Sequence, residues 1–320
     1  MGMMNRLIKI CILSLSSLWL NACDISLVPV APDTASATFQ PSIDLGDVEN
    51  PALGEASGLA ASRMNPGYFW SHNDSGNPNV LYYFDDKGKG LRSFELAGSS
   101  NRDWEDMAIL GESDGSATVY VADFGDNNAA YSDYAIYWFK EPTVNAGTSA
   151  QIAAVNSLKF TLPDGARDME CLLIDQKSKD IFIVSKRENN KRLYKIPASN
   201  VVKGARIQAE FVQELTFSIP VIADSRVVSV NYITGGAVSA DNSEILIKNY
   251  FEMYYWKRSS GETIPAALKR PPVKVTYAGI NSDGSGQEVQ GEAITFAADG
   301  SGYYSLGEGS AAHLYYYKKK

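Results

Sequence analysis

A short sequence signature recurs five times along the chain, and no other feature constrains the fold as strongly. Four copies begin with Glu and one with Thr, and each continues through a small or short residue into an apolar run. The first residues of the copies are Glu55, Glu105, Glu170, Thr234 and Glu292. The intervals between them are 50, 65, 64 and 58 residues, a mean of about 59. A repeat of this length predicts one supersecondary unit per copy.

Two further β-type segments follow every signature. The second segments are 68–71, 118–121, 180–184, 244–247 and 302–305, and the Tyr-rich third segments are 81–84, 134–138, 192–195, 252–256 and 313–317. Short strands separated by turn residues at a fixed period are typical of a β-propeller. The repeat therefore predicts an all-β protein, a single β-propeller with five blades. A double β-sandwich is the alternative, but it offers no reason for five matched units.

The two ends of the repeat predict how the ring closes. The last unit stops after its third strand, and a strand-like segment at 38–45 precedes the first unit. Because an open sheet edge invites unwanted pairing, we expect this N-terminal strand to complete the C-terminal blade. Six blades remain an alternative, because residues 209–218 and 225–232 hold further strand-like sequence.

Composition agrees with a β fold and narrows the partners. The chain carries 26 Gly, 18 Tyr and 12 Phe, a mixture that suits strands and tight turns. Its hydrophobic content of 45% and charged content of 21% fit a folded domain. An excess of 37 acidic over 29 basic side chains gives a net charge of −8, which argues against nucleic acid as a partner.

The first 22 residues have the features of an export signal. Arg6 and Lys9 precede an apolar stretch at 10–20 that is too short to span a bilayer. The following segment, Leu20-Asn21-Ala22-Cys23, resembles the lipobox of bacterial lipoproteins. This resemblance implies cleavage before Cys23 and a diacylglyceryl thioether on its sulfur. An ordinary signal peptide with a chance cysteine is the alternative.

The lipobox resemblance sets the expected organisation and location of the chain. We expect a signal peptide at 1–22, a tether at 23–37 and the propeller domain at 38–320. The propeller would be lipid-anchored in the cell envelope and face the periplasm or the cell exterior. Asp24 directly after Cys23 favours the inner membrane, by the enterobacterial sorting rule. With Cys11 in the signal and Cys23 lipidated, Cys171 stands alone, and we expect a buried structural thiol.

The signature acids are candidates for a site on the propeller axis. The first strand of each blade lines the central channel, so its polar side chains are expected to converge. These side chains are Glu55, Glu105, Glu170 and Glu292. Carboxylates at short range repel one another and must be protonated, paired or bound to a cation. In a purely structural alternative, Arg102 and Arg167 lock these acids through bidentate hydrogen bonds.

The loops after the second strands are expected to meet at one mouth of this channel. Their oxygen donors suit a hard cation such as calcium rather than zinc or copper. With the channel acids, the candidate metal ligands are Glu55, Asn73, Asp74, Glu105, Asp123, Asp126, Asn127, Glu170 and Glu292. Polar turns of this kind also form simply to satisfy their own backbone. His72 lies in the densest of these loops, and His72 or Glu105 is the candidate general base.

Several motifs together resemble a group of secreted bacterial propeller proteins without an assigned activity. They are Glu55-Ala-Ser-Gly-Leu, His72-Asn-Asp-Ser-Gly, Asp103-Trp-Glu-Asp-Met and Gly125-Asp-Asn, and the resemblance spans roughly residues 50–320. The Glu-then-Asn/Asp arrangement is more weakly similar to propeller lactonases of the regucalcin type and to phytase-like propeller esterases. That similarity implies calcium held on the axis by one Glu and several Asn or Asp side chains.

Two functions fit these features. The first is a membrane-anchored propeller that binds a small molecule or a protein partner at an acidic, calcium-binding central mouth. The alternative is a calcium-dependent hydrolase of ester, lactone or phosphoester bonds, in which the ion polarises the substrate and activates water. A panel of such substrates separates the two functions.

Overall fold

The computed structural model describes residues 38–49, 51–90, 92–217, 231–279, 288, 290–309 and 312–320. The expected signal peptide and tether, with Cys23 and Asp24, lie outside the described residues. Within the described ranges, no helix has both the length and the apolar character needed to cross a membrane.

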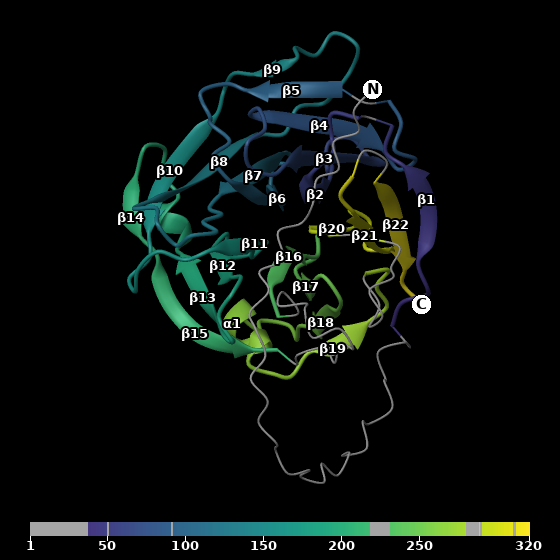
Figure 1. The fold of residues 1–320 in the computed structure, drawn as a ribbon. Coiled ribbons are helices and arrows are strands. Elements are labelled where there is room, and N and C mark those ends of the chain that lie inside the picture. Colours follow the sequence, from purple (N-terminus) through teal and green to yellow (C-terminus); the bar gives the residue numbers. More distant parts are fainter. Residues whose placement is uncertain are drawn as a thin grey trace, which may run out of the picture. The chain divides into compact units, whose positions relative to one another are not determined.

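Five small sheets surround a central axis and form the blades of a five-bladed β-propeller (Figure 1). Blade 1 contains β2 (Ala56–Ala61), β3 (Tyr68–Asn73), β4 (Val80–Asp85), β5 (Arg92–Leu96) and β9 (Gln151–Ile152). Blade 2 contains β6 (Trp104–Gly111), β7 (Ala117–Asp123), β8 (Tyr134–Lys140), β10 (Asn156–Thr161) and β14 (Arg206–Gln208). Blade 3 contains β11 (Met169–Ile174), β12 (Ile181–Ser185), β13 (Asn190–Ile196) and β15 (Glu210–Thr216).

The remaining elements complete the ring. Blade 4 contains β16 (Ile233–Val238), β17 (Glu244–Asn249), β18 (Met253–Lys257) and β19 (Val273–Val275). Blade 5 contains β20 (Ala293–Phe296), β21 (Gly302–Leu306), β22 (His313–Lys318) and β1 (Ile43–Asp47). Two short helices, η2 (Ala198–Asn200) and α1 (Ile264–Leu268), lie in connections. This arrangement confirms the predicted five-bladed propeller and shows that the double-sandwich alternative was wrong.

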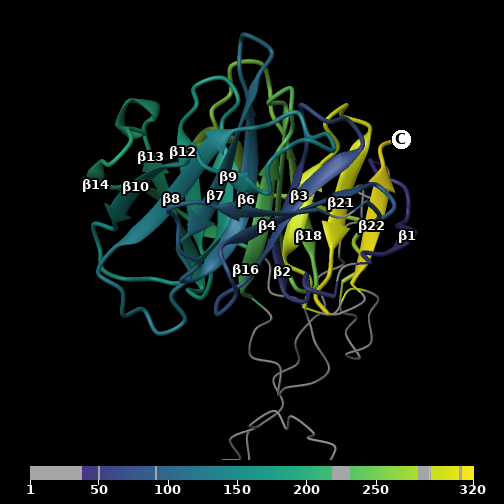
Figure 2. The same cartoon turned by 90° about the horizontal axis from the view of Figure 1, so that it is seen from above.

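The inner strand of each blade contacts the inner strands of both neighbouring blades, which closes the ring around the axis. Seen after a 90° turn, the strands run from one face of the ring to the other (Figure 2). The first strands of the repeat therefore line the channel, as the sequence predicts.

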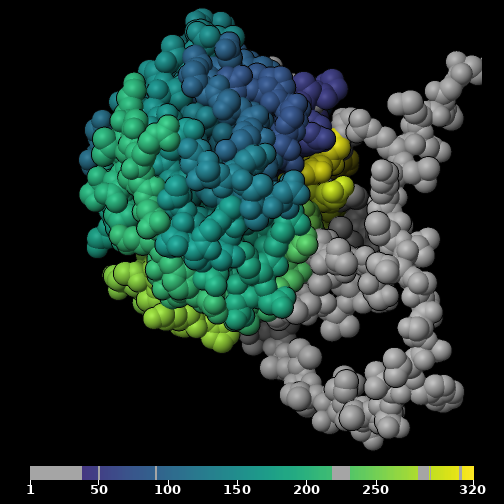
Figure 3. Space-filling model, turned by 60° about the vertical axis from the view of Figure 1, so that its left-hand side comes forward, coloured from purple at the N-terminus to yellow at the C-terminus, as the bar shows by residue number. Residues whose placement is uncertain are grey.

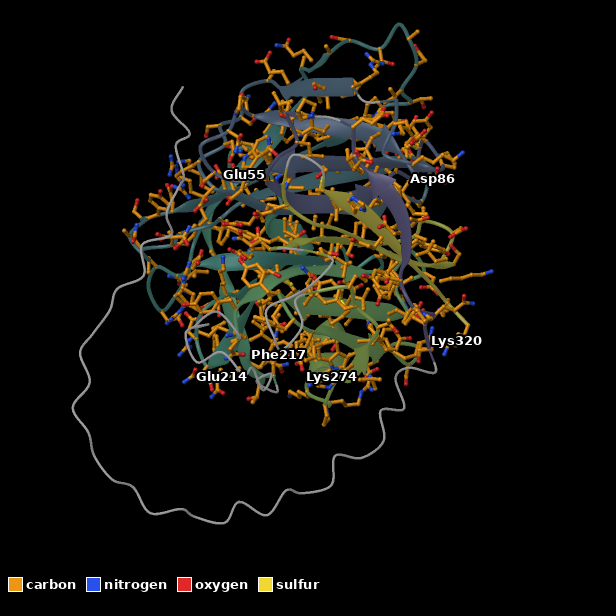
Figure 4. The ribbon with its side chains drawn as sticks, turned by 45° about the vertical axis from the view of Figure 1, so that its right-hand side comes forward. Glu55, Asp86, Glu214, Phe217, Lys274 and Lys320 are labelled. Carbon is orange, nitrogen blue, oxygen red and sulfur yellow. The ribbon has the colours of Figure 1, made fainter. Side chains whose placement is uncertain are left out.

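The N-terminal strand closes the last blade, as expected. Strand β1 pairs antiparallel with β22, and Phe39 forms an isolated bridge with Lys319. The backbone N–H of Lys320, labelled in Figure 4, donates to the carbonyl of Thr38 at 3.1 Å. The expected strand at 38–45 is divided around Pro41, which has no N–H to donate to a ladder.

One outer strand, β15, accounts for the first of the two segments that suggested a sixth blade, 209–218. Strand β15 forms the outer edge of blade 3, and β14 adds in parallel to β10 of blade 2. The second strand-like segment, 225–232, lies almost entirely outside the described residues. In the same way β9 adds in parallel to β5 of blade 1. The propeller thus extends two of its blades with segments from later in the chain.

Apolar side chains fill the space between neighbouring blades rather than a single central core. Five buried clusters each combine residues of two adjacent blades. The cluster between blades 1 and 2, for example, contains Trp70, Phe94 and Trp104. The space-filling view shows the blue, teal and green residues of successive blades packed side by side (Figure 3). This packing holds the blades in one frame and fixes their inner edges.

A buried carboxylate ties three blades together at the axis. Asp106 of β6 accepts hydrogen bonds from the backbone N–H of Leu172 in β11, at 2.7 Å, and of Gly236 in β16, at 3.3 Å. Cys171 lies beside this junction as a buried free thiol, and burial raises the pKa of that thiol well above its ordinary value. It is therefore a structural residue, as predicted.

Candidate functional site

A β-bulge at the start of four inner strands presents one side chain of each blade to the axis. The register between first and second strands shifts at equivalent points in blades 1 to 4, which leaves one residue without a ladder partner in each blade. These bulge residues are Ser57, Glu105, Glu170 and Thr234. Bulges commonly re-aim side chains beside functional sites. In blade 5, Glu292 directly precedes β20 at the matching position.

This register corrects the alignment made from sequence in blade 1. The residue equivalent to Glu105 is Ser57, not Glu55. Glu55, labelled in Figure 4, is exposed just before β2. Its carboxylate accepts a hydrogen bond from the Asn77 amide at 2.7 Å. The expected convergence therefore holds for Glu105, Glu170 and Glu292, whereas Glu55 lies at the rim.

Three carboxylates from three blades form a first triad at the mouth of the channel. Ligand atoms of Asp74, Glu105 and Glu292 all lie within 4.8 Å of one another. The Ser57 hydroxyl donates to the Glu105 backbone carbonyl at 2.6 Å and lies 3.3 Å from Glu105 Oε2 and 3.2 Å from Glu292 Oε2. The Tyr250 hydroxyl donates to Glu292 Oε1 at 2.7 Å. Among the described residues, no Lys or Arg forms an ion pair with these three acids.

A second triad shares Glu105 with the first. It consists of Glu105, Asp168 and Glu170, again with ligand atoms within 4.8 Å. Here protein cations are present, because Lys186 pairs with Glu170 and Arg187 pairs with Asp168. Asp168 Oδ1 also accepts the backbone N–H of Asp126 at 2.9 Å. We call the two triads together, Asp74, Glu105, Asp168, Glu170 and Glu292, the axial acidic centre.

Two buried carboxylate oxygens, one in this centre and one beside it, have no hydrogen-bond partner among the described residues. Glu170 is 1% exposed, and its Oε2 has no hydrogen-bond partner. Asp103 is 5% exposed, and its Oδ1 also has no hydrogen-bond partner. Both Asp103 and Glu105 lie against the backbone of Gly125, so their carboxylates are neighbours. Buried polar atoms are almost always satisfied in native proteins. The axial acidic centre can therefore bind a metal ion.

The carboxylates of the mouth resist ionisation in the absence of a bound cation. Burial, reinforced by the charges of Asp74 and Glu292, raises the pKa of Glu105 well above its ordinary value. Burial also raises the pKa of Asp74 and of Glu292. Burial and the charge of Asp74 raise the pKa of Asp103 to about 7. Burial and the charge of Glu292 raise the pKa of Glu308 to about 8. A divalent cation would reverse these shifts by favouring the ionised forms.

Four other predicted ligands make hydrogen bonds away from the two triads. The Asn73 side chain bonds to the backbone of Ala52 and Glu55, and Asp123 accepts the backbone N–H of Asp103 at 2.8 Å. Asp126 accepts N–H groups of its own loop, and Asn127 accepts from Arg187. These residues hold the loops that carry Asp74, Asp103 and Asp168.

His72 lies inside the interface between blades 1 and 2. It is fully buried, its ring meets Trp104 edge-on at 5.5 Å, and its Nδ1 lies 3.1 Å from the Asn73 carbonyl. Burial lowers the pKa of His72 to about 4, so the imidazole is neutral at pH 7. Its Nδ1 partner is a backbone carbonyl and not a carboxylate. The second histidine, His313, pairs with Asp44 across the β1–β22 closure.

The predicted arginine locks are replaced by other cations. Arg167 pairs with Asp164 and Glu188, and the Arg102 guanidinium lies 4.0 Å from the ring centroid of Tyr131. The locks on the second triad come instead from Lys186 and Arg187, which directly follow β12. Of the four signature acids, Glu170 is therefore paired with a protein cation, as in the structural alternative, but the cation is Lys186 and not an arginine.

Four residues of the site were missed as ligands or partners: Ser57, Asp168, Lys186 and Tyr250. Asp74, Lys186 and Tyr250 each directly follow the second strand of their blade. The sequence predicted that these loops meet at the mouth and named Asp74 as a ligand, but it gave Lys186 and Tyr250 no role there. A signal for Asp168 is the pattern Arg-Asp-x-Glu, which occurs at 102–105 and again at 167–170 and places an Asp two residues before the signature Glu.

Comparisons with known proteins add little beyond the fold. No family model matches the chain, and no curated protein matches it either. Among solved structures, a protein from Bacteroides uniformis ATCC 8492, provisionally assigned as a 6-phosphogluconolactonase, aligns with a TM-score of 0.37 and 14% identity. The alignment covers 78% of this chain and 64% of that protein, less than two thirds of its length. At this TM-score the likeness is distant, and the fold and the site rest on the chain's own geometry.

Proposed function

We propose that the propeller holds a calcium ion at the first triad and uses it to bind a ligand at the mouth of the channel. The carrying observation is the convergence of Asp74, Glu105 and Glu292 within 4.8 Å without an ion-paired Lys or Arg among the described residues. Three carboxylates, with the oxygens of Ser57 and Tyr250 beside them, form a hard, all-oxygen donor set of the kind that calcium prefers.

The test is a calcium titration of the full-length chain, purified in detergent and first stripped with a chelator. We expect saturable heat in calorimetry and a higher melting temperature with millimolar calcium. Glu105→Gln should abolish both, since Glu105 belongs to both triads. Asp114→Asn, at an exposed turn of blade 2, is the matched control and should behave like the unmodified chain. An unchanged melting temperature with millimolar calcium would exclude the site.

The proposed location is the cell envelope, with the propeller anchored through a lipid on Cys23. Support comes from the basic start, the short apolar stretch and the lipobox-like segment that ends in Cys23. Radiolabelled fatty acid should be incorporated into the chain in bacteria, and Cys23→Ala should abolish both labelling and sedimentation with membranes. Labelling that survives Cys23→Ala would contradict this anchor.

A second candidate function is hydrolysis of an ester, lactone or phosphoester. It is favoured by Asp103, whose unpartnered Oδ1 and pKa of about 7 suit a general base beside a cation that polarises the substrate. Calcium-dependent turnover on a panel of these substrates, lost in Asp103→Asn while calcium is still bound, would favour the enzyme. Calcium binding without turnover favours the binding protein.

A further inference from the structure

The second triad already contains a positive charge supplied by the protein. Lys186 directly follows β12, at the position that Asp74 occupies after β3 in blade 1. The two positions make the same backbone hydrogen bond. The N–H of Lys186 donates to the Asp168 carbonyl, and the N–H of Asp74 donates to the Glu55 carbonyl. Equivalent loop positions thus present an acid in one blade and an ammonium in another.

The Lys186 ammonium lies inside the acidic centre rather than at its edge. It is 6% exposed and pairs with Glu170, whose second carboxylate oxygen has no partner. Its charge also acts on Asp74, Glu105 and Glu292 of the first triad. The Lys186 ammonium therefore acts electrostatically on both triads, but it forms a direct ion pair only in the second.

The protein's own cations are placed so as to favour a metal ion at the first triad and not at the second. Lys186 and Arg187 pair with two of the three carboxylates of the second triad. Among the described residues, no Lys or Arg forms an ion pair with the three carboxylates of the first triad, so their charge is left for a divalent cation. A second ion would also have to approach the Lys186 ammonium closely in a water-poor site, where repulsion between like charges is strong.

We infer that Lys186 is a built-in second cation of the axial acidic centre, which limits the centre to one divalent cation, bound at Asp74, Glu105 and Glu292. This inference rests on the proposed calcium site. Lys186 then determines stoichiometry: its ammonium holds Glu170, while Arg187 holds Asp168, in the arrangement that a second metal would otherwise impose. Replacing the ammonium by an uncharged side chain of similar length would free the second triad for a metal ion.

The experiment counts bound calcium per chain by calorimetry and by elemental analysis after gel filtration of the full-length protein in detergent. The unmodified chain should bind one equivalent, Lys186→Met two, and Lys186→Arg one, because arginine keeps the charge. Adding Asp168→Asn to Lys186→Met should return the count to one. Lys177→Met, at a surface turn of blade 3, is the matched control and should bind one equivalent.

The outcomes separate this inference from the proposed function. No calcium on the unmodified chain removes the site and the inference with it. Two equivalents on the unmodified chain, or one on Lys186→Met, leave the calcium site standing and overturn the role of Lys186. If Lys186→Met is unstable without metal, its melting temperature should rise more with calcium than that of the unmodified chain, and an equal or smaller rise counts against the inference.

Discussion

Gly125 is the point where two carboxylates of the mouth approach the backbone most closely. A Cβ at this position would collide with Glu105 Oε1 and with the Asp103 carboxyl group. Gly125 does not have a positive φ, so alanine is excluded by the carboxylates and not by backbone strain. We expect Gly125→Ala to displace Glu105 and weaken calcium binding by about tenfold or more, equivalent to at least ~1.4 kcal/mol. Calorimetry of the variant measures this loss.

The matched control for this prediction is Gly147→Ala. Gly147 lies in an exposed loop, and its nearest neighbour would be a side-chain oxygen of Asn145 at 3.4 Å, an ordinary contact. Its calcium affinity should equal that of the unmodified chain. Equal affinity in Gly125→Ala as well would show that Glu105 does not bind the ion from the position described here.

At the residue level, the sequence predicted the composition of the site better than its register. Glu105, Glu170, Glu292 and Asp74 were all expected at the mouth and are all there. Glu55 was placed beside them because its signature resembles theirs. A β-bulge places Ser57 at the equivalent position instead. The residue pattern alone does not show where a β-ladder contains an extra, unpaired residue, so the register could not be predicted.

At the scale of single elements, the N-terminal segment that closes the ring carries one fully buried aromatic side chain. Phe39 is fully buried and packs edge-on against Tyr255 of blade 4 and Tyr303 of blade 5. We expect Phe39→Ala to lower the free energy of unfolding by about 3–5 kcal/mol, the usual cost of such a cavity. Urea unfolding followed by tryptophan fluorescence measures this loss.

Ile43→Ala provides the comparison for Phe39→Ala. Ile43 lies on the same closing segment, in β1, but its side chain is exposed. Its loss should cost less than about 1 kcal/mol, as at most surface positions. Similar losses for the two variants would mean that backbone pairing with β22, and not the packing of Phe39, closes the ring.

Strands with a strong local pattern were predictable, and those without one were not. Inner, second and third strands combine β-branched or aromatic residues with nearby turns, so each blade could be read from its own segment. Strands β9 and β14 are two and three residues long and pair in parallel with strands far away in sequence. Such additions depend on tertiary contacts, which local sequence patterns do not contain.

At the scale of the whole molecule, negative charge is gathered where five blades meet. The ring of buried interblade contacts fixes the inner strands, so the axial carboxylates cannot move apart to relieve their repulsion. These acids must therefore be protonated or bind a cation, or else their repulsion destabilises the folded propeller. Which of these applies depends on pH.

The stability of the chain without calcium should fall as pH rises from about 4 through about 8. Folding raises the pKa of Asp103 to about 7 and of Glu308 to about 8, so the folded state binds more protons than the unfolded state between those values and about pH 4. The stabilisation is complete below the unfolded pKa and is lost as pH passes the folded pKa. The melting temperature measured in chelator should therefore fall by about 3 °C or more between about pH 6 and about pH 9.

Calcium should oppose this fall, because it favours the ionised carboxylates that are costly without it. The increase in melting temperature produced by millimolar calcium should therefore be larger at about pH 9 than at about pH 6, where protons compete with the metal. Glu105→Gln should lose the calcium effect at both values, which separates binding at the centre from a general effect of the salt. An equal calcium effect at both values would mean that the ion binds away from the buried carboxylates, on a surface whose acids are already ionised.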